Sequence, residues 1–193
     1  MTARASLIVG SDGKSRCSWV GLDEEYTRYH DEEWGVPLLG DQKVFEKISL
    51  EGFQAGLSWI TILRKRPAFR EVFHDFDIER VAAMTDEDVE RLLQDARIIR
   101  HRGKITAAIG NARTTLALGE SLADLVWSFA PTGTLRPRPV AWTDVPAVTP
   151  ESTELSKTLR KRGYRFVGPT TMYALMQSAG IVDDHFEGCW RAE

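Results

Sequence analysis

Apolar residues recur along most of this chain at intervals of three and four, which predicts helices, and no segment shows convincing strand alternation. The residues that we expect in helix caps or first turns precede these apolar runs; they are Asp41, Pro67, Asp77, Thr85 (in Thr85-x-x-Asp88) and Ser121. The run after Asp41, for example, places Val44, Phe45 and Ile48 on one helix face. The pattern therefore predicts an all-α protein.

The second half of the chain continues this pattern around one interruption. Residues 104–118 form the longest run with helical spacing. Residues 131–150 contain five prolines, which predicts a connection without regular structure between two helical parts. A further helix should end near Gly163, and the last one should begin at Pro169 and end at Gly180.

Length and composition fit an ordinary globular protein. The chain has 193 residues, of which 42% are hydrophobic, and this suits one domain or two intimately packed lobes. We expect a single domain over residues 17–193, preceded by an N-terminal extension over residues 1–16. No apolar run approaches the roughly 20 residues that span a bilayer, and the first residues lack a signal-peptide core. We therefore expect a soluble cytoplasmic protein with no membrane partner.

The charge distribution argues against a strongly basic, indiscriminate nucleic-acid binder. The net charge is −3 and the pI is about 5.9. Basic residues nevertheless gather in the segments 64–70, 97–113 and 157–165. Each segment alone is best interpreted as a solvated helix face, whereas the three together suggest a binding surface.

The two cysteines of the chain each have a histidine nearby. Cys17 and His30 lie near the N-terminus, and His185 and Cys189 lie near the C-terminus. Zn²⁺ prefers four tetrahedral ligands of this kind, and a closed set leaves no position for water, so we expect a structural zinc ion that joins the termini. Isolated reduced cysteines or a disulfide are the alternatives, and a reducing compartment disfavours the disulfide.

A short basic segment, 95-DARIIRHRGKI-105, lies between two predicted helices. Its geometry would present backbone N–H groups at the start of the second helix, where a phosphate is favoured. Helix-hairpin-helix proteins hold a DNA backbone in this way. On spacing alone, an ordinary helix–helix connection with exposed basic residues is the better interpretation.

Glu51 lies in apolar and glycine-rich surroundings, eight residues before Trp59. A buried carboxylate is costly unless a donor or a cation pairs with it. Aromatic residues are frequent upstream; they are Trp19, Tyr26, Tyr29 and Trp34. A carboxylate among aromatic rings suits a flat cationic ligand. The alternatives are a solvent-facing glutamate and aromatic rings that pack in the core.

Several of these segments closely resemble the bacterial 3-methyladenine DNA glycosylase I family. The matching segments run from Cys17 to Cys189; they are 17-CSWV, 26-YTRYHDEEWGVP, 50-LEGFQAGLSWITIL, 92-LLQDARIIRHRGKI and 166-FVGPTTMYALMQSAGIVDDH. The resemblance implies a helix-hairpin-helix glycosylase fold with a zinc ion that joins the termini. By motif position the implied zinc ligands are Cys17, His30, His185 and Cys189.

The resemblance also implies roles in base recognition. Glu51 would bond the amine edge of a methylated adenine, Tyr29 and Trp59 would stack on the base, and the rings that line or support the pocket would be Tyr26, Trp19 and Trp34. The loop 54-QAGL-57 would lie at the gap left in the duplex, with Gln54 and Gly56 close to the DNA and Leu57 as a wedge. The implied backbone contacts in the hairpin are Arg100, His101, Arg102, Gly103 and Lys104.

The implied activity is hydrolytic excision of 3-methyladenine from alkylated double-stranded DNA, which leaves an abasic site. The enzyme would flip the base out of the stack and would need no nucleotide cofactor. Many relatives in the superfamily carry a catalytic aspartate after the hairpin, but the family resembled lacks it; Asp124 is the carboxylate that we consider for that position, and a first-turn helix residue is the better interpretation. We expect a monomer, because one DNA-facing surface suffices.

Two other functional classes share some of these features. A zinc-stabilised protein could recognise damaged DNA without cleaving it, and a zinc hydrolase would need an open coordination position. One residue departs from the family pattern. Arg97 occupies a hairpin position where glycine is common, so either this turn needs no positive φ or its phosphate contact differs.

Overall fold

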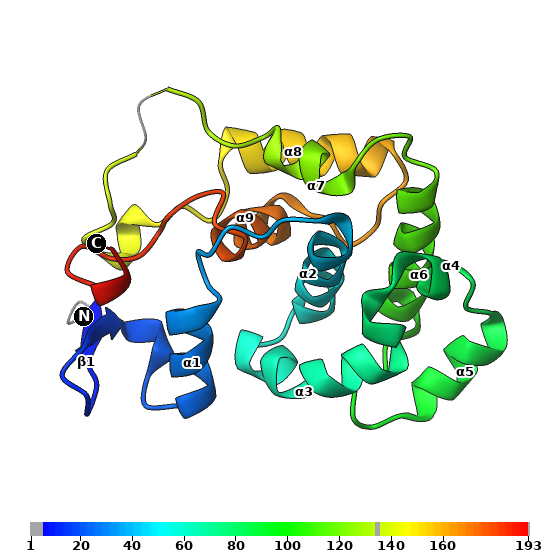
Figure 1. Ribbon diagram of the computed structural model, residues 1–193, viewed down its shortest axis with the longest axis horizontal. Helices are drawn as coiled ribbons and strands as arrows, with labels where there is room; N and C mark the ends of the chain where they lie inside the picture. The colour runs from blue at the N-terminus through cyan, green and yellow to red at the C-terminus, as the bar shows by residue number, and fades with distance from the viewer. Residues whose placement is uncertain (1–5, 134–135, 193) are drawn as a thin grey trace.

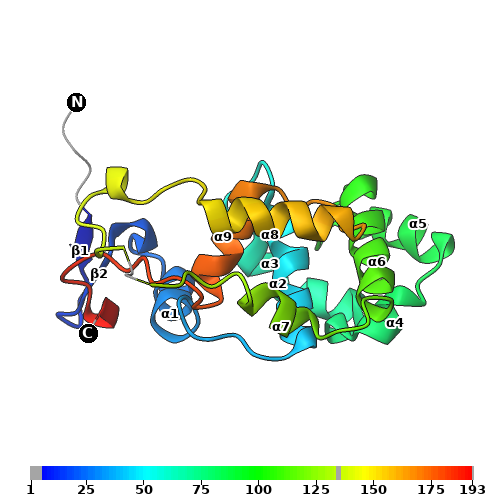
Figure 2. The ribbon, with the colours of Figure 1, turned by 90° about the horizontal axis from the view of Figure 1, so that it is seen from above.

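The computed structural model describes residues 6–133 and 136–192 and is mostly helical. The parts of the N-terminal extension and of the proline-rich connection at residues 1–5 and 134–135 lie outside the described residues. In the two ribbon views, the small sheet and the C-terminal residues lie at the same end of the molecule (Figures 1 and 2). The segments near the two termini therefore lie at one end of the molecule.

The helical elements follow one another with short connections, except for the proline-rich segment. The α-helices are α1 (Glu24–Glu32), α2 (Asp41–Gln54), α3 (Trp59–Val72), α4 (Ile78–Ala82), α5 (Asp86–Gln94), α6 (Arg102–Leu116), α7 (Leu122–Trp127), α8 (Pro150–Lys161) and α9 (Pro169–Ser178). Within the described residues, short 3₁₀ turns lie at Ser18–Val20, His74–Phe76, Trp142–Asp144 and Trp190–Ala192.

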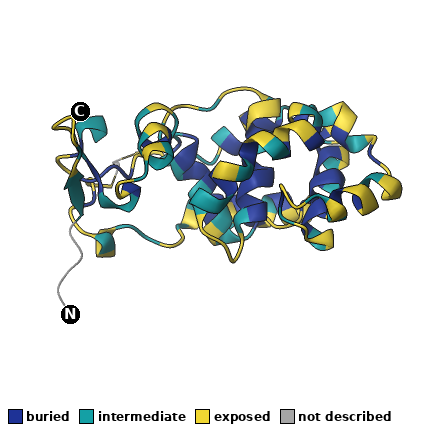
Figure 3. Cartoon of the chain, turned by 90° about the horizontal axis from the view of Figure 1, so that it is seen from below, coloured by how far each residue is buried: buried dark blue, intermediate teal, exposed yellow. Residues whose placement is uncertain are grey.

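Helix α2 lies at the centre of the larger apolar core. Its residues Val44, Phe45 and Ile48 are buried with side chains from α3, α6, α8 and α9. A separate small cluster surrounds Cys17 and Cys189 at the end where the termini meet. The burial colouring shows this distribution, with the buried residues concentrated inside the helical body (Figure 3). The sequence pattern correctly identified the central core.

Most of the predicted helix boundaries are confirmed. Asp77 caps α4, Thr85 and Asp88 form a capping box at α5, and Ser121 caps α7. The helix predicted over residues 104–118 is α6, which begins and ends two residues earlier. Gly180 has a φ of 71° just after α9, where a left-handed residue ends the helix.

The cap predicted at Asp41 and the helix start predicted at Pro67 are wrong. Asp41 is the first residue of α2 and does not cap it, because the N-cap residue of α2 is Gly40. Pro67 does not open a helix but lies inside α3, which begins at Trp59. The apolar face of α3 continues from Ile62 through Phe69 across the proline. Burial of that face outweighs the hydrogen bond that proline cannot donate.

The expectation of no strands was wrong near the N-terminus. Strands β1 (Leu7–Val9) and β2 (Ser15–Cys17) pair antiparallel, with Leu7 opposite Cys17. The segment is too short for alternation to be visible in sequence. Within the proline-rich connection, the 3₁₀ turn at Trp142–Asp144 also departs from the expected lack of regular structure. None of the described helices combines the length and apolar character needed to cross a bilayer.

Asp41 caps a different helix from the one expected. Its carboxylate accepts hydrogen bonds from the Ala123 N–H (2.9 Å) and the Ser121 hydroxyl (2.6 Å), at the start of α7. Burial favours the neutral acid, but these hydrogen bonds outweigh it and hold the pKa of Asp41 below its usual value. Asp41 therefore joins α2 to the first turn of α7.

We expect Asp41→Ala to lower the free energy of unfolding by about 1–2 kcal/mol, because α7 loses this cap. The exposed Asp124→Ala should change it much less. A carboxylate with a lowered folded-state pKa stabilises the protein above its unfolded value of about 3.9, and that contribution is lost as the pH falls. The difference in melting temperature between Asp41→Ala and the wild type should therefore shrink below about pH 4; a difference that grows there would contradict this assignment.

Candidate functional site

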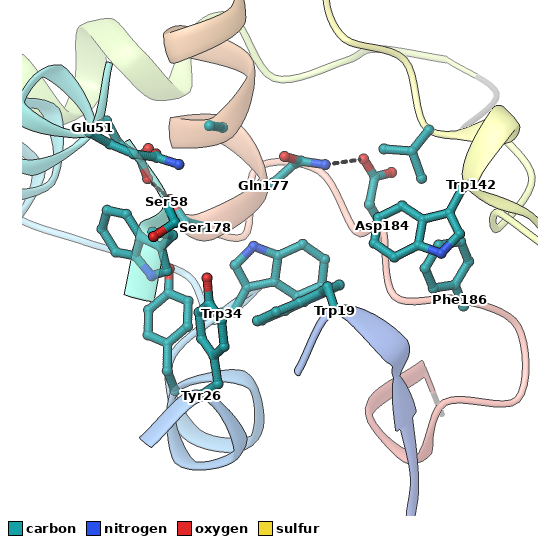
Figure 4. Close-up of a pocket in the computed structure, with 15 residues that line it drawn as sticks. Trp19, Tyr26, Trp34, Glu51, Ser58, Trp142, Gln177, Ser178, Asp184 and Phe186 are labelled. Atoms are coloured by element: carbon teal, nitrogen blue, oxygen red, sulfur yellow. Dashed lines mark hydrogen bonds between the residues drawn. The ribbon is translucent and has the colours of Figure 1, made fainter. Parts of the chain in front are cut away.

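A cavity of about 440 Å³ lies between the end that contains the termini and the helical body. Its walls come from α1, α2, the start of α3, α9 and the proline-rich connection (Figure 4). The lining residues are Trp19, Tyr26, Tyr29, Trp34, Glu51, Gln54, Ser58, Trp59, Trp142, Val145, Ala174, Gln177, Ser178, Asp184 and Phe186. Every residue predicted for base recognition is therefore in one cavity.

Glu51 supplies a carboxylate at the buried side of this cavity. It is only 4% exposed, and its Oε1 atom accepts a hydrogen bond from Ser178 Oγ at 3.3 Å. The ammonium of Lys47, one helical turn earlier, lies 3.7 Å from the same oxygen. Burial raises the pKa of Glu51, while Lys47 opposes this rise. Glu51 is thus buried and partnered, and the alternative of a solvent-facing glutamate does not hold.

The aromatic side chains form a wall around this carboxylate. Trp19 packs edge-on against Tyr26 and Trp34, with ring centroids 5.4 and 5.2 Å apart. Tyr29 and Trp59 lie with centroids 5.5 Å apart at an angle of 45°. The Tyr26 hydroxyl accepts a hydrogen bond from the Ile60 N–H at 2.9 Å, which fixes α1 against the start of α3. The electron-rich faces of these aromatic rings suit a flat cation.

Cys17, His30 and Cys189 form a buried group that could hold a metal ion. One ligand atom from each residue lies within 4.8 Å of the others. The His30 Nε2 atom is 3.4 Å from Cys189 Sγ, and its Nδ1 atom is 2.8 Å from an Asp31 carboxylate oxygen. The hydrogen bond from the Cys17 thiol and the nearby His30 lower the pKa of Cys189 to about 4, which favours a thiolate.

His185 lies beside this group, although it is outside the three-residue set. Its ring packs edge-on against His30 at 5.1 Å and against Trp34 at 4.6 Å. Its Nδ1 atom lies 2.8 Å from Asp183 Oδ1, while its buried Nε2 atom has no hydrogen-bond partner among the described residues. Histidines that bind a metal ion through one ring nitrogen often bond a carboxylate through the other, and His185 has such a carboxylate in Asp183.

The loop predicted to meet the duplex gap lies at the rim of the cavity. Gln54 and Ser58 line the cavity, and Leu57 between them is 41% exposed. Gly56 has a φ of 83°, a conformation that side chains rarely adopt. The loop therefore exposes an apolar side chain beside the cavity, and the role of Leu57 as a wedge stays a prediction.

The predicted hairpin is the connection between α5 and α6. Arg100, His101 and Arg102 are exposed there, and His101 caps α6 by accepting a hydrogen bond from the Lys104 N–H. Gly103 is half-buried in the first turn of α6. Arg97 does not have a positive φ. Its guanidinium pairs with the carboxylates of Glu71 and Asp95. The turn therefore does not need glycine at this position.

Comparison with known proteins identifies the family. Residues 19–192 match the family model described as methyladenine glycosylase. The DNA-3-methyladenine glycosylase 1 of Escherichia coli (strain K12) is 54% identical over 177 residues, which cover 90% of this chain and 95% of that protein. This chain belongs to the methyladenine glycosylase family.

Solved structures agree with this assignment. A crystal structure of 3-methyladenine DNA glycosylase I matches with a TM-score of 0.87 and 54% identity, over 91% of this chain and 98% of that one. A structure of the Staphylococcus aureus enzyme, described as showing the basis of 3-methyladenine recognition, matches with a TM-score of 0.85 and 35% identity, over 91% and 95% of the two chains.

The sequence interpretation missed several cavity residues of this family member. Asp184 is buried and accepts hydrogen bonds from Gln177 Nε2 (2.8 Å), the Tyr173 hydroxyl (2.5 Å) and Arg136 (Figure 4). Arg136 belongs to the proline-rich connection, which also contributes Trp142 and Val145 to the cavity wall. No local sequence pattern predicts these long-range contacts. The contact of Lys47 with Glu51 could have been predicted, because residues four apart share a helix face.

Lys104 has a structural contact that sequence analysis did not anticipate. It is buried, and its ammonium donates hydrogen bonds to the carbonyls of Phe53 (2.9 Å) and Ala55 (2.7 Å). These carbonyls lie where α2 ends and the rim loop begins. Lys104 therefore ties the start of α6 to the rim loop, and the predicted contact of its side chain with DNA stays a prediction.

We expect Lys104→Met to lower the free energy of unfolding by about 2 kcal/mol, since two carbonyls lose a charged donor. Amide hydrogen exchange at residues 55–57 should become faster in the absence of DNA. Arg100→Met, at an exposed neighbouring position, should leave both stability and exchange unchanged. Unaltered exchange in Lys104→Met would show that the loop is held by other contacts.

Proposed function

We propose that this protein is a DNA repair enzyme that excises 3-methyladenine from alkylated double-stranded DNA by hydrolysis of the N-glycosidic bond. The observation that carries the proposal is the buried Glu51 carboxylate inside an aromatic cavity, in a member of the methyladenine glycosylase family. The cavity is large enough for a purine, and its rim carries the exposed Leu57.

The chemistry follows from the charge of the damaged base. Adenine methylated at N3 is cationic while it is attached to the sugar. Cleavage of the C1′–N9 bond sends the bonding electrons to the base, which leaves as a neutral molecule. Water adds to C1′ and releases a proton, so that an abasic site remains. Because the leaving group is already activated, the protein supplies mainly recognition and positioning.

The cavity contains no obvious general base in addition to Glu51. Of the described lining residues, the other carboxylate is Asp184, whose oxygens already accept three hydrogen bonds. Asp124, the carboxylate considered from sequence, is exposed on α7 and is not a lining residue. Recognition of the cation by Glu51 is therefore the principal contribution that we propose.

Discrimination against normal adenine has the same origin. In a complex with neutral adenine, the Glu51 carboxylate would be desolvated without a cationic partner in the ligand. The charge-assisted hydrogen bond that a cationic base would donate to Glu51 is then missing, and nothing in the ligand offsets the desolvation. Tyr29 and Trp59 would stack on the base, while Trp19, Tyr26 and Trp34 support them.

We expect Glu51→Gln to keep the fold and to lose excision of 3-methyladenine by at least about 100-fold, which corresponds to about 2.7 kcal/mol of transition-state stabilisation. The measurement is chromatographic release of free bases from methylated duplex DNA. The exposed Glu79→Gln on α4 is the matched control and should be fully active. Normal activity of Glu51→Gln would refute the role of Glu51, and a folded wild type without activity would favour a DNA-binding protein that cleaves nothing.

The DNA would be held by the rim loop and by the α5–α6 connection as a helix-hairpin-helix element. Gln54, Gly56 and Leu57 would lie against the gap left by the flipped nucleotide. Backbone N–H groups at the start of α6 and the side chains of Arg100, His101 and Arg102 would contact phosphates. A monomeric state and a cytoplasmic site of action stay predictions.

We further propose that the metal-binding group holds one structural Zn²⁺. Cys17, His30, His185 and Cys189 supply two thiolates and two imidazoles, which is a closed donor set for zinc. The support is the buried, unpartnered Nε2 atom of His185 beside the other three residues. The ion would fasten the segments near the two termini and would take no part in the reaction.

We expect one zinc per chain by elemental analysis, and we expect His185→Ala to lose most of it and to melt at a lower temperature. His74→Asn removes an imidazole away from the cluster and should keep the metal. A chelator should lower the melting temperature of the wild type toward that of His185→Ala. Full zinc content in His185→Ala would rule out His185 as a ligand.

A further inference from the structure

Lys47 is a buried lysine for which the glycosylase chemistry above gives no role. Its ammonium donates a 2.6 Å hydrogen bond to the Tyr29 hydroxyl and lies 4.1 Å from the centre of the Trp59 ring. The distance to Glu51 Oε1 is 3.7 Å. The side chain therefore contacts the proposed base-binding carboxylate and both proposed stacking rings from behind.

The other charged side chains near Lys47 and Glu51 form ion pairs of their own. Arg66 from α3 pairs with Glu33 at the end of α1, and Arg70 pairs with Glu46 at 2.8 Å. The groups that face Lys47 from its own helix are Glu46 and Glu51, and α9 contributes the uncharged Ser178. With Lys47 protonated and Glu51 ionised, this part of the empty cavity is electrically neutral.

A protonated Lys47 beside Glu51 disfavours the binding of a cation at this carboxylate. When a cationic base bonds Glu51, two positive charges compete for one buried carboxylate, and like charges in such surroundings disfavour each other strongly. If one protein group near the base loses a proton, the net charge of the ligand, Glu51, Lys47 and Tyr29 together returns to zero. Tyr29 is not the source of this proton, because burial holds the pKa of this phenol well above its ordinary value.

We propose that Lys47 neutralises Glu51 in the empty site and loses its proton to solvent when a cationic base takes over the carboxylate. Burial already lowers the pKa of Lys47 to about 8, against the opposing effect of Glu51. A second positive charge lowers it further. Lys47 and Ser178 also line a second cavity of about 310 Å³ on the other side, which gives the proton a route outward.

The same exchange favours product release. After cleavage of the glycosidic bond, the base in the pocket is neutral and no longer competes for Glu51. Lys47 takes up a proton from solvent, and the Lys47–Glu51 ion pair forms again. The neutral product therefore lacks the contact with Glu51 that the cation had, which allows it to leave. This inference rests on the proposed function.

The test is the number of protons released when a small cation binds. The probe is 3,9-dimethyladeninium, in which a methyl group replaces the sugar so that nothing can be cleaved, and the reference ligand is neutral 3-methyladenine. Calorimetric titrations of the zinc-loaded protein in phosphate and in Tris give the proton count. We expect close to one proton released per cation at pH 7, none for the neutral base, and none at pH 9.

The affinity for the cation should rise by close to tenfold per pH unit below pH 8 and become constant above it, because the cation binds the form in which Lys47 is neutral. Lys47→Arg keeps a positive charge that cannot be lost. We expect this variant to release no proton and to bind the cation at least tenfold more weakly at pH 7.5, with its affinity for the neutral base nearly unchanged. Lys161→Arg, exposed on α8 and outside both cavities, is the matched control.

Three results would overturn the inference: no proton released by the wild type, an equal release by Lys47→Arg, or a release that disappears well below pH 8 and so belongs to Glu51. The wild-type titration decides the matter even if Lys47→Arg does not fold. Excision of 3-methyladenine by the same preparation separates this inference from the proposed function, since an active enzyme that releases no proton refutes the role of Lys47 alone.

Discussion

Desolvation of the Glu51 carboxylate is the constraint on which the cavity depends. A carboxylate that is 4% exposed requires donors and positive charge; Lys47 on α2 and Ser178 on α9 supply them, and Tyr29 on α1 accepts a hydrogen bond from Lys47. These partners also fix the relative positions of the three helices. The same electrostatic requirement thus joins these helices, and the contacts of Glu51 with Ser178 and Lys47 are both made by its Oε1 atom.

The second requirement is closure of the cavity by segments far apart in sequence. Trp19 and Trp34 come from the first part of the chain, whereas Asp184 and Phe186 come from the last. The hairpin β1–β2 positions Cys17, and Arg16 beside it bonds Asp31, which in turn contacts His30. The cluster of cysteines and histidines therefore holds the aromatic wall at the right place while remaining outside the cavity.

Sequence patterns predicted those features that arise from local physics. Periodic burial and capping residues located most helices, and ligand chemistry identified Cys17, His30 and Cys189 as a group that the structure brings together. The resemblance to a family contributed the residues of the base pocket. The patterns failed where a partner came from elsewhere in the chain. Asp41 binds α7 instead of its own helix, and Pro67 is tolerated because α3 is buried on both sides of it.

The order of the cavity residues along the chain has a consequence for biosynthesis. A chain emerging from the ribosome can form α2 to α6 early, because their contacts are largely among themselves. Trp34 would lack its packing contact with His185, and the cavity would lack Asp184 and Phe186, until these residues have emerged. A nascent or truncated chain would thus have a folded helical body but no closed cavity. Such a chain could not hold an extruded base, so incomplete molecules would not compete with finished ones for sites of damage.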